Sequence, residues 1–116
     1  MITLTQLISV APFPSDTKEE LLAQEETLSV DKKLQLEELC WQLISQWYQN
    51  ELRAKQEMAV MEMTKGEKTY TKEDLQKMGD DLFEDLLKKV ALHENEEDLS
   101  EAREKLNNLL EGQPTH

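Results

Sequence analysis

Residues 29–65 read SVDKKLQLEELCWQLISQWYQNELRAKQEMAVMEMTK, and their apolar positions recur with the period of an α-helix. The stretch begins with Ser29, a residue type suited to cap a helix, and it is followed by Gly66, which commonly terminates one. One apolar stripe comprises Leu36, Cys40, Leu43, Trp47, Ala54, Met58 and Met61. A second stripe comprises Leu34, Trp41, Ile44, Tyr48 and Leu52. The sequence therefore predicts one long helix over residues 30–64.

The two stripes make this helix broadly apolar between Leu39 and Leu52. A helix on the surface of a globular protein shows one apolar face of roughly 100° or somewhat more. We therefore expect the long helix to be covered on two sides, whereas one helix hairpin covers only one. The candidate interface comprises nine residues of the two stripes: Leu36, Trp41, Leu43, Ile44, Trp47, Tyr48, Leu52, Met58 and Met61.

Capping signals mark the other helices. Asp16 followed by Glu19 has the spacing of a capping box and predicts a short helix. Thr71 and Asn95 precede acidic first turns, and Gly112 with Pro114 predicts the end of the last helix. We predict an all-α fold: a small helical bundle of three main helices plus a short N-terminal one. The last two helices are expected to form an antiparallel C-terminal hairpin against the long helix.

We expect one helical domain over residues 16–112, preceded by an N-terminal arm over residues 1–15 and followed by a frayed tail over residues 113–116. The first ten residues fit either a short helix or an extended segment. Pro12 and Pro14 then interrupt the chain, because proline removes a backbone donor. Phe13 between them either packs the arm onto the core or anchors an exposed peptide in a partner.

Composition excludes several classes of protein. The 116 residues include 13 Lys and Arg against 25 Asp and Glu, a formal net charge of -12. Direct binding to nucleic acid is not expected, because phosphates are contacted by Lys and Arg. No apolar run approaches the ~20 residues that span a bilayer. With a single cysteine and no signal-peptide pattern, the chain is expected to be cytoplasmic, with no membrane partner.

We find no motif that indicates catalysis. Cys40 lies on the apolar stripe and is expected to be a buried thiol, and the acidic residues are expected on solvated helix faces. No Gly-rich phosphate loop and no Glu-x-x-His pair is present. The sequence therefore predicts a protein that is not an enzyme and that has no cofactor and no metal site.

The remaining hypothesis is a non-enzymatic, acidic, helical protein–protein interaction module or small accessory subunit. Its partner would be another protein or a second copy of the chain in a homodimer. Met58, Met61 and Met63 form either an adaptable contact surface or ordinary core. The alternative is an acidic inhibitor that occupies the nucleic-acid-binding site of a basic protein, since most of the negative charge lies near the two ends of the chain.

Overall fold

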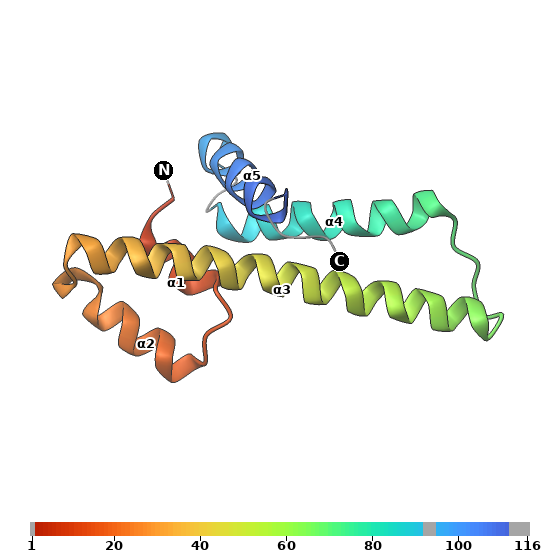
Figure 1. Cartoon of the computed structure of the whole chain (residues 1–116), viewed down its shortest axis with the longest axis horizontal. Coiled ribbons are helices and arrows are strands. Elements are labelled where there is room, and N and C mark those ends of the chain that lie inside the picture. The colour runs from red at the N-terminus through yellow and green to blue at the C-terminus, as the bar shows by residue number, and fades with distance from the viewer. Residues whose placement is uncertain (1, 92–94, 112–116) are drawn as a thin grey trace.

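The computed structural model describes residues 2–91 and 95–111, and every regular element in these ranges is a helix. The elements are α1 (Leu4–Val10), α2 (Ser15–Gln24), the 3-10 turn η1 (Glu25–Thr27), α3 (Val30–Thr64), α4 (Lys72–Val90) and α5 (Glu96–Glu111). Helices α3, α4 and α5 pack against one another (Figure 1). The predicted all-α bundle is confirmed.

The long helix α3 spans the whole molecule. Its 35 residues correspond to about 52 Å at 1.5 Å per residue, against a longest molecular extent of 55 Å. The hydroxyl of Ser29 accepts a hydrogen bond from the Lys32 N–H at 3.3 Å. Gly66 follows the last turn with a φ of 75°, in the left-handed region that glycine adopts without strain. Both predicted ends of the long helix are therefore confirmed.

Helix α4 runs antiparallel to the C-terminal half of α3 (Figure 1). A capping box begins it: Thr71 Oγ1 accepts from the Asp74 N–H at 3.1 Å, and the Thr71 N–H donates to Asp74 Oδ2 at 2.9 Å. The two helices approach closely at Gly79, where a Cβ atom would lie 3.4 Å from Leu52 Cδ1. Tyr48 donates a hydrogen bond to the Gly79 carbonyl at 3.2 Å, which fixes the pairing of the two helices.

Helix α5 turns back and crosses α3 and α4 obliquely (Figure 1). The side chain of Asn95 caps it by accepting from the backbone of Glu97 at 2.9 Å, as its position in the sequence predicts. The expected stop at Gly112 and Pro114 and the expected tail over residues 113–116 lie outside the described residues.

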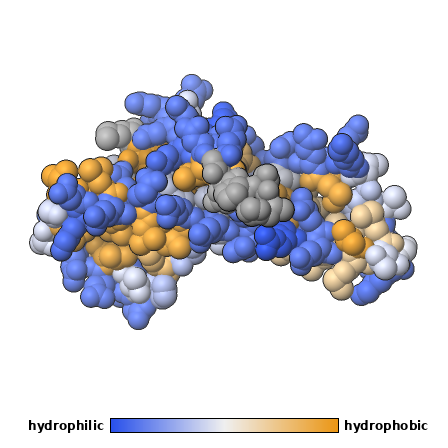
Figure 2. Space-filling model, in the orientation of Figure 1, coloured by the Kyte–Doolittle hydropathy of each residue, from blue (hydrophilic) through white to orange (hydrophobic). Residues whose placement is uncertain are grey.

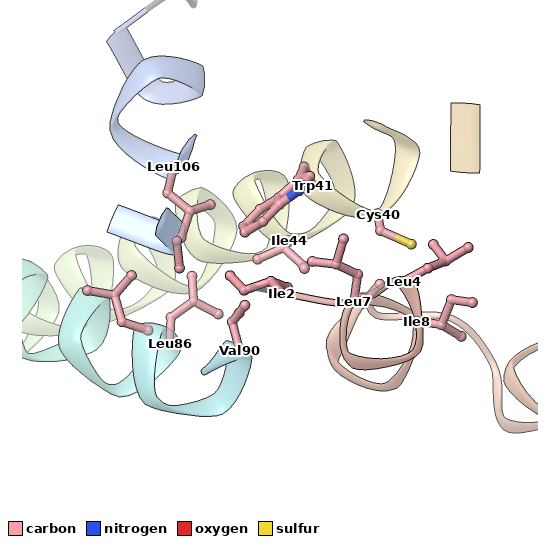
Figure 3. Packing of buried hydrophobic residues seen from close by; sticks show 13 residues of the cluster. Ile2, Leu4, Leu7, Ile8, Cys40, Trp41, Ile44, Leu86, Val90 and Leu106 are labelled. Carbon is pink, nitrogen blue, oxygen red and sulfur yellow. The ribbon is translucent and has the colours of Figure 1, made fainter. Parts of the chain in front are cut away.

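The core lies where four helices meet, over the N-terminal half of α3 (Figure 3). Leu7 and Ile8 of α1 are fully buried there. The other fully or largely buried members of this cluster are Ile2, Leu4, Ala11, Cys40, Trp41, Ile44, Leu86, Leu87, Val90, Ala102 and Leu106. Residues 2–11 are therefore part of the core, and α1 covers a side of α3 that α4 and α5 leave open.

Polar contacts attach α1 to the ends of α4 and α5. Gln6 Nε2 donates to the Val90 carbonyl at 3.1 Å and to Asp98 Oδ2 at 3.3 Å, and the Ile2 N–H donates to Glu101 Oε2 at 3.0 Å. Asp98 is only 6% exposed. The expectation that every acidic residue lies on a solvated face is therefore wrong for Asp98, because α1 docks against the first turn of α5.

The capping box predicted at Asp16 and Glu19 is wrong. Asp16 as N-cap would make Thr17 the first helical residue, but helix α2 begins two residues earlier, at Ser15, with Pro14 as its N-cap and no side-chain cap. Asp16 therefore lies within the first turn, where it accepts from the Thr17 N–H at 2.9 Å. None of the α2 side chains is fully buried, and α2 contacts mainly α1 and η1.

We predict that Leu7→Ala lowers the free energy of unfolding by about 2–5 kcal/mol, because it leaves a cavity at a fully buried site in a four-helix junction. The matched variant Leu22→Ala in α2 removes the same atoms from a side chain that is 37% exposed. We expect it to cost less than about 1 kcal/mol. Urea denaturation followed by circular dichroism measures both, and equal losses would show that α1 is not part of the cooperative core.

Candidate functional site

The nine candidate interface residues lie in three different environments. Trp41 and Ile44 belong to the core, with 6% and 1% of their surface exposed. Five residues are half-buried, and Met58 and Met61 are exposed. The half-buried residues are Leu36, Leu43, Trp47, Tyr48 and Leu52. Trp41 and Ile44 are therefore not part of an exposed surface, because α1, α4 and α5 meet over this part of α3.

Tyr48 and Leu52 face α4. The rings of Tyr48 and Phe83 meet edge to face with their centroids 5.6 Å apart, an arrangement that aromatic pairs prefer. Leu52 lies against Gly79. These two candidate residues therefore hold α3 and α4 together.

Trp47 lies at the edge of the part of α3 that α1 covers. It forms one wall of an open groove of about 220 Å³, together with Val10, Pro12, Ile44, Leu86 and Lys89. The Lys89 ammonium lies 5.2 Å from the centroid of the Trp47 ring, within cation–π range. The groove is smaller than the roughly 300–1,000 Å³ of typical small-molecule sites. Its lining offers apolar contact and one cation, which suits a protein side chain better than a reaction centre.

Beyond Trp47 the same stripe continues without a cover. We name Ala54, Met58 and Met61 the methionine face; all three are exposed, Met58 by 63% and Met61 by 56%. Ala59 is buried on the side of the helix toward α4. Val60 is 53% exposed but lies off the methionine face, because successive helical residues are about 100° apart. Figure 2 shows apolar colour at this end of the molecule.

The methionine face lies in an electrically neutral part of an acidic protein. Residues 47–65 contain three acidic and three basic side chains, whereas the whole chain has a net charge of -12. The acidic residues elsewhere do not form one uninterrupted face. Glu84 pairs with Arg103 at 3.0 Å, and Glu38 pairs with Lys105 at 3.3 Å.

Further apolar side chains are exposed at the opposite end of the molecule, where Figure 2 shows a second apolar region over α2 and the start of α3. They are Leu22, Val30, Leu34 and Leu39. Leu39 lies on the opposite side of α3 from Val30, since nine residues correspond to two and a half turns. These residues therefore do not make one continuous face of α3.

Cys40 is the one cysteine of the chain, and it is fully buried, as its place on the stripe predicts. Burial and, to a smaller extent, the negative charge of Glu37 raise the pKa of its thiol to about 11. A reactive cysteine needs a lowered pKa and access to solvent. The Cys40 thiol has neither.

Within residues 2–91 and 95–111, no group of three or more His, Cys, Asp or Glu side chains is placed to bind a metal ion. In the same part of the chain, none of the helices has both the length and the apolar character needed to cross a bilayer. No family model, no curated protein and no solved structure matches this chain.

We predict that Cys40 in the folded protein reacts with a thiol reagent at least about a hundredfold more slowly at pH 7.5 than in urea, because only the exposed thiolate attacks. Its pKa is raised on folding, so the folded state binds the thiol proton more tightly than the unfolded state. Ionisation of Cys40 should therefore leave the free energy of unfolding unchanged below about pH 9 and should lower it as the pH rises from there toward 11. Labelling at the same rate with and without urea would contradict the burial of Cys40.

Proposed function

We propose that this chain is a non-enzymatic protein–protein interaction module whose docking element is the C-terminal half of α3. One observation carries the proposal: α1 covers the apolar stripe of α3 only as far as Trp47, and the stripe continues through Met58 and Met61 with more than half of each side chain exposed. A contiguous exposed apolar face with polar residues around it is typical of an interaction site.

The chemistry of the face supports a protein as the partner. Methionine side chains are flexible and polarisable, so they adapt to the apolar surface of another protein. The groove beside Trp47 adjoins this face and adds an aromatic ring with a lysine above it. Trp is enriched among the residues that contribute most to binding in protein interfaces. The methionine face and the Trp47 groove are thus two neighbouring apolar areas along α3, with the exposed Glu51 between them.

The alternative, an inhibitor that imitates the charge of a nucleic acid, requires regularly spaced acidic residues on one exposed side. The pairs Glu84–Arg103 and Glu38–Lys105 place basic groups among the acids of α3, α4 and α5. No specific observation favours this alternative over the interaction module. We also propose a cytoplasmic location, since the single cysteine is a buried free thiol and a reducing compartment suits it.

The proposal is tested by using the tagged protein to capture binding proteins from an extract of the native cells. We predict that the double variant Met58→Lys with Met61→Lys loses at least about 90% of any specifically captured protein, because two charges would be buried in the contact. The matched control Val60→Lys places a lysine on the same turn of α3 but off the methionine face, and it should capture as the wild type does. Mass spectrometry identifies the captured chains.

The double variant should keep its helical circular dichroism and its melting temperature, since both methionines are exposed. Capture of the same proteins in the same amounts by all three forms would refute the methionine face as the docking site.

A further inference from the structure

We infer that a second copy of this chain docks antiparallel along the methionine face, with a two-fold axis passing beside Met58. This inference rests on the proposed function and names the partner. Three observations support it: the length of the uncovered stripe, the order of charges along it, and the place of the remaining negative charge in the molecule.

The methionine face runs from Ala54 to Met61, so its midpoint lies between Glu57 and Met58. Toward the start of α3 the next covered residue is Trp47, which lies beside Val10 and Pro12. Toward the end of α3, Glu67 and Lys68 line a hollow together with Met58 and Met61. Glu51 and Lys65 lie seven residues on either side of Met58, or about 10 Å along the helix. A two-fold axis beside Met58 therefore places residues 51–65 of one copy against the same residues of the other copy. A contact of this type is self-complementary, as a closed dimer requires.

The charges along this length have an order that favours the antiparallel arrangement. With the axis at Met58, Glu51 of each copy lies at the level of Lys65 of the other copy, so that two pairs of opposite charge flank the apolar centre. A parallel arrangement would place Glu51 beside Glu51 and Lys65 beside Lys65. Opposite charges across an interface select the register and the orientation of the partner.

The rest of the negative charge also favours this arrangement. Residues 1–29 and 94–116 together carry a net charge of −9 of the total −12. The described parts of these segments, α1, α2 and α5, lie at the end of the molecule that holds the N-terminal half of α3 (Figure 1). Helices α1 and α5 pack against α3, as the Lys105–Glu38 pair shows for α5, and α2 packs mainly against α1. Antiparallel pairing through the C-terminal half places the two acidic ends at opposite ends of the dimer, where their mutual repulsion is screened.

Glu57, next to Met58, opposes the association because it would approach Glu57 of the other copy near the axis. The contact is also limited to one face of about four to five helical turns, which is less than the ~1,600 Å² of a standard interface. We therefore place the dissociation constant in the micromolar range. The chain should be a monomer when dilute and a dimer at roughly 100 µM and above.

Sedimentation equilibrium of the purified full chain over about 5–500 µM tests this inference. We expect Met58→Lys to weaken dimerisation at least about tenfold, since two lysines would meet at the axis. The matched variant Val60→Lys should leave it unchanged. Glu51→Lys and Lys65→Glu should each weaken it about 3- to 10-fold, because each breaks two pairs. The double variant E51K/K65E should recover the wild-type constant, and Glu57→Gln should tighten the dimer.

Disulfide trapping checks the register independently. On oxidation, Met58→Cys should form a cross-linked dimer at 100 µM, whereas Val60→Cys should not. The native Cys40 does not interfere, because it is buried.

A wild-type chain that stays monomeric at every concentration overturns the inference, as does a dimer that Met58→Lys leaves intact. Single charge reversals without effect would overturn the antiparallel orientation. The proposed function fails separately, when the methionine variants capture the same proteins as the wild type. Capture of a different protein through an intact methionine face, with a monomeric pure chain, would support the proposed function and refute the second copy as the partner.

Discussion

The breadth of the apolar surface on the N-terminal half of α3 is the constraint on which the other contacts depend. Helix α1 has only seven residues, and a helix of that length is unstable in water by itself. It forms because Leu7 and Ile8 are buried among side chains of α3, with Thr3 and Gln6 completing a capping box at its start. The same docking places Gln6 against Val90 and Asp98, so α1 also joins α4 to α5. The N-terminal segment is therefore structural in this protein.

The short length of α1 also explains why part of α3 remains exposed. Seven residues of helix span about 10 Å, whereas α3 is about 52 Å long. Helix α4 covers the side of α3 that carries Tyr48, Leu52 and Ala59. The side that carries Met58 and Met61 has a cover only as far as Trp47. The exposed apolar face is thus a consequence of two covering helices of unequal length on one long helix.

Charge and apolar surface are separated along the molecule. The acidic helices α2 and α5 lie at the end of the molecule that holds the N-terminal half of α3, whereas residues 47–65 of α3 and its cap are neutral. Surface ion pairs such as Glu84–Arg103 contribute little to stability. The excess of acids instead gives the molecule a net negative electrostatic potential. A neutral apolar face in an acidic molecule is therefore the place where contact costs the least electrostatic energy.

Local features could be predicted from the sequence because they involve residues a few positions apart. Each of three helices begins with a side-chain oxygen that accepts a hydrogen bond from a backbone N–H of its first turn; these oxygens belong to Ser29, Thr71 and Asn95. The periodicity and the flanking residues of α3 likewise predicted both of its ends. The start of α2 was mispredicted because Asp16 has the residue type of an N-cap, whereas the helix begins directly after Pro14 without a side-chain cap. The candidate site was predicted only in part: the stripes were identified, but not which of their residues stay exposed.

Only the tertiary structure decided which of those residues are core and which are surface. Trp41 and Met58 both lie on apolar stripes of the same helix, yet Trp41 is buried and Met58 is exposed. The difference comes from α1 and α5, which are distant from α3 in sequence and cover its N-terminal half alone. Asp98 is buried for the same reason, since its neighbour Gln6 is 92 residues away. Helical periodicity and capping depend on residues within one segment, so they can be predicted from that segment alone. Burial depends on which distant segment packs against it.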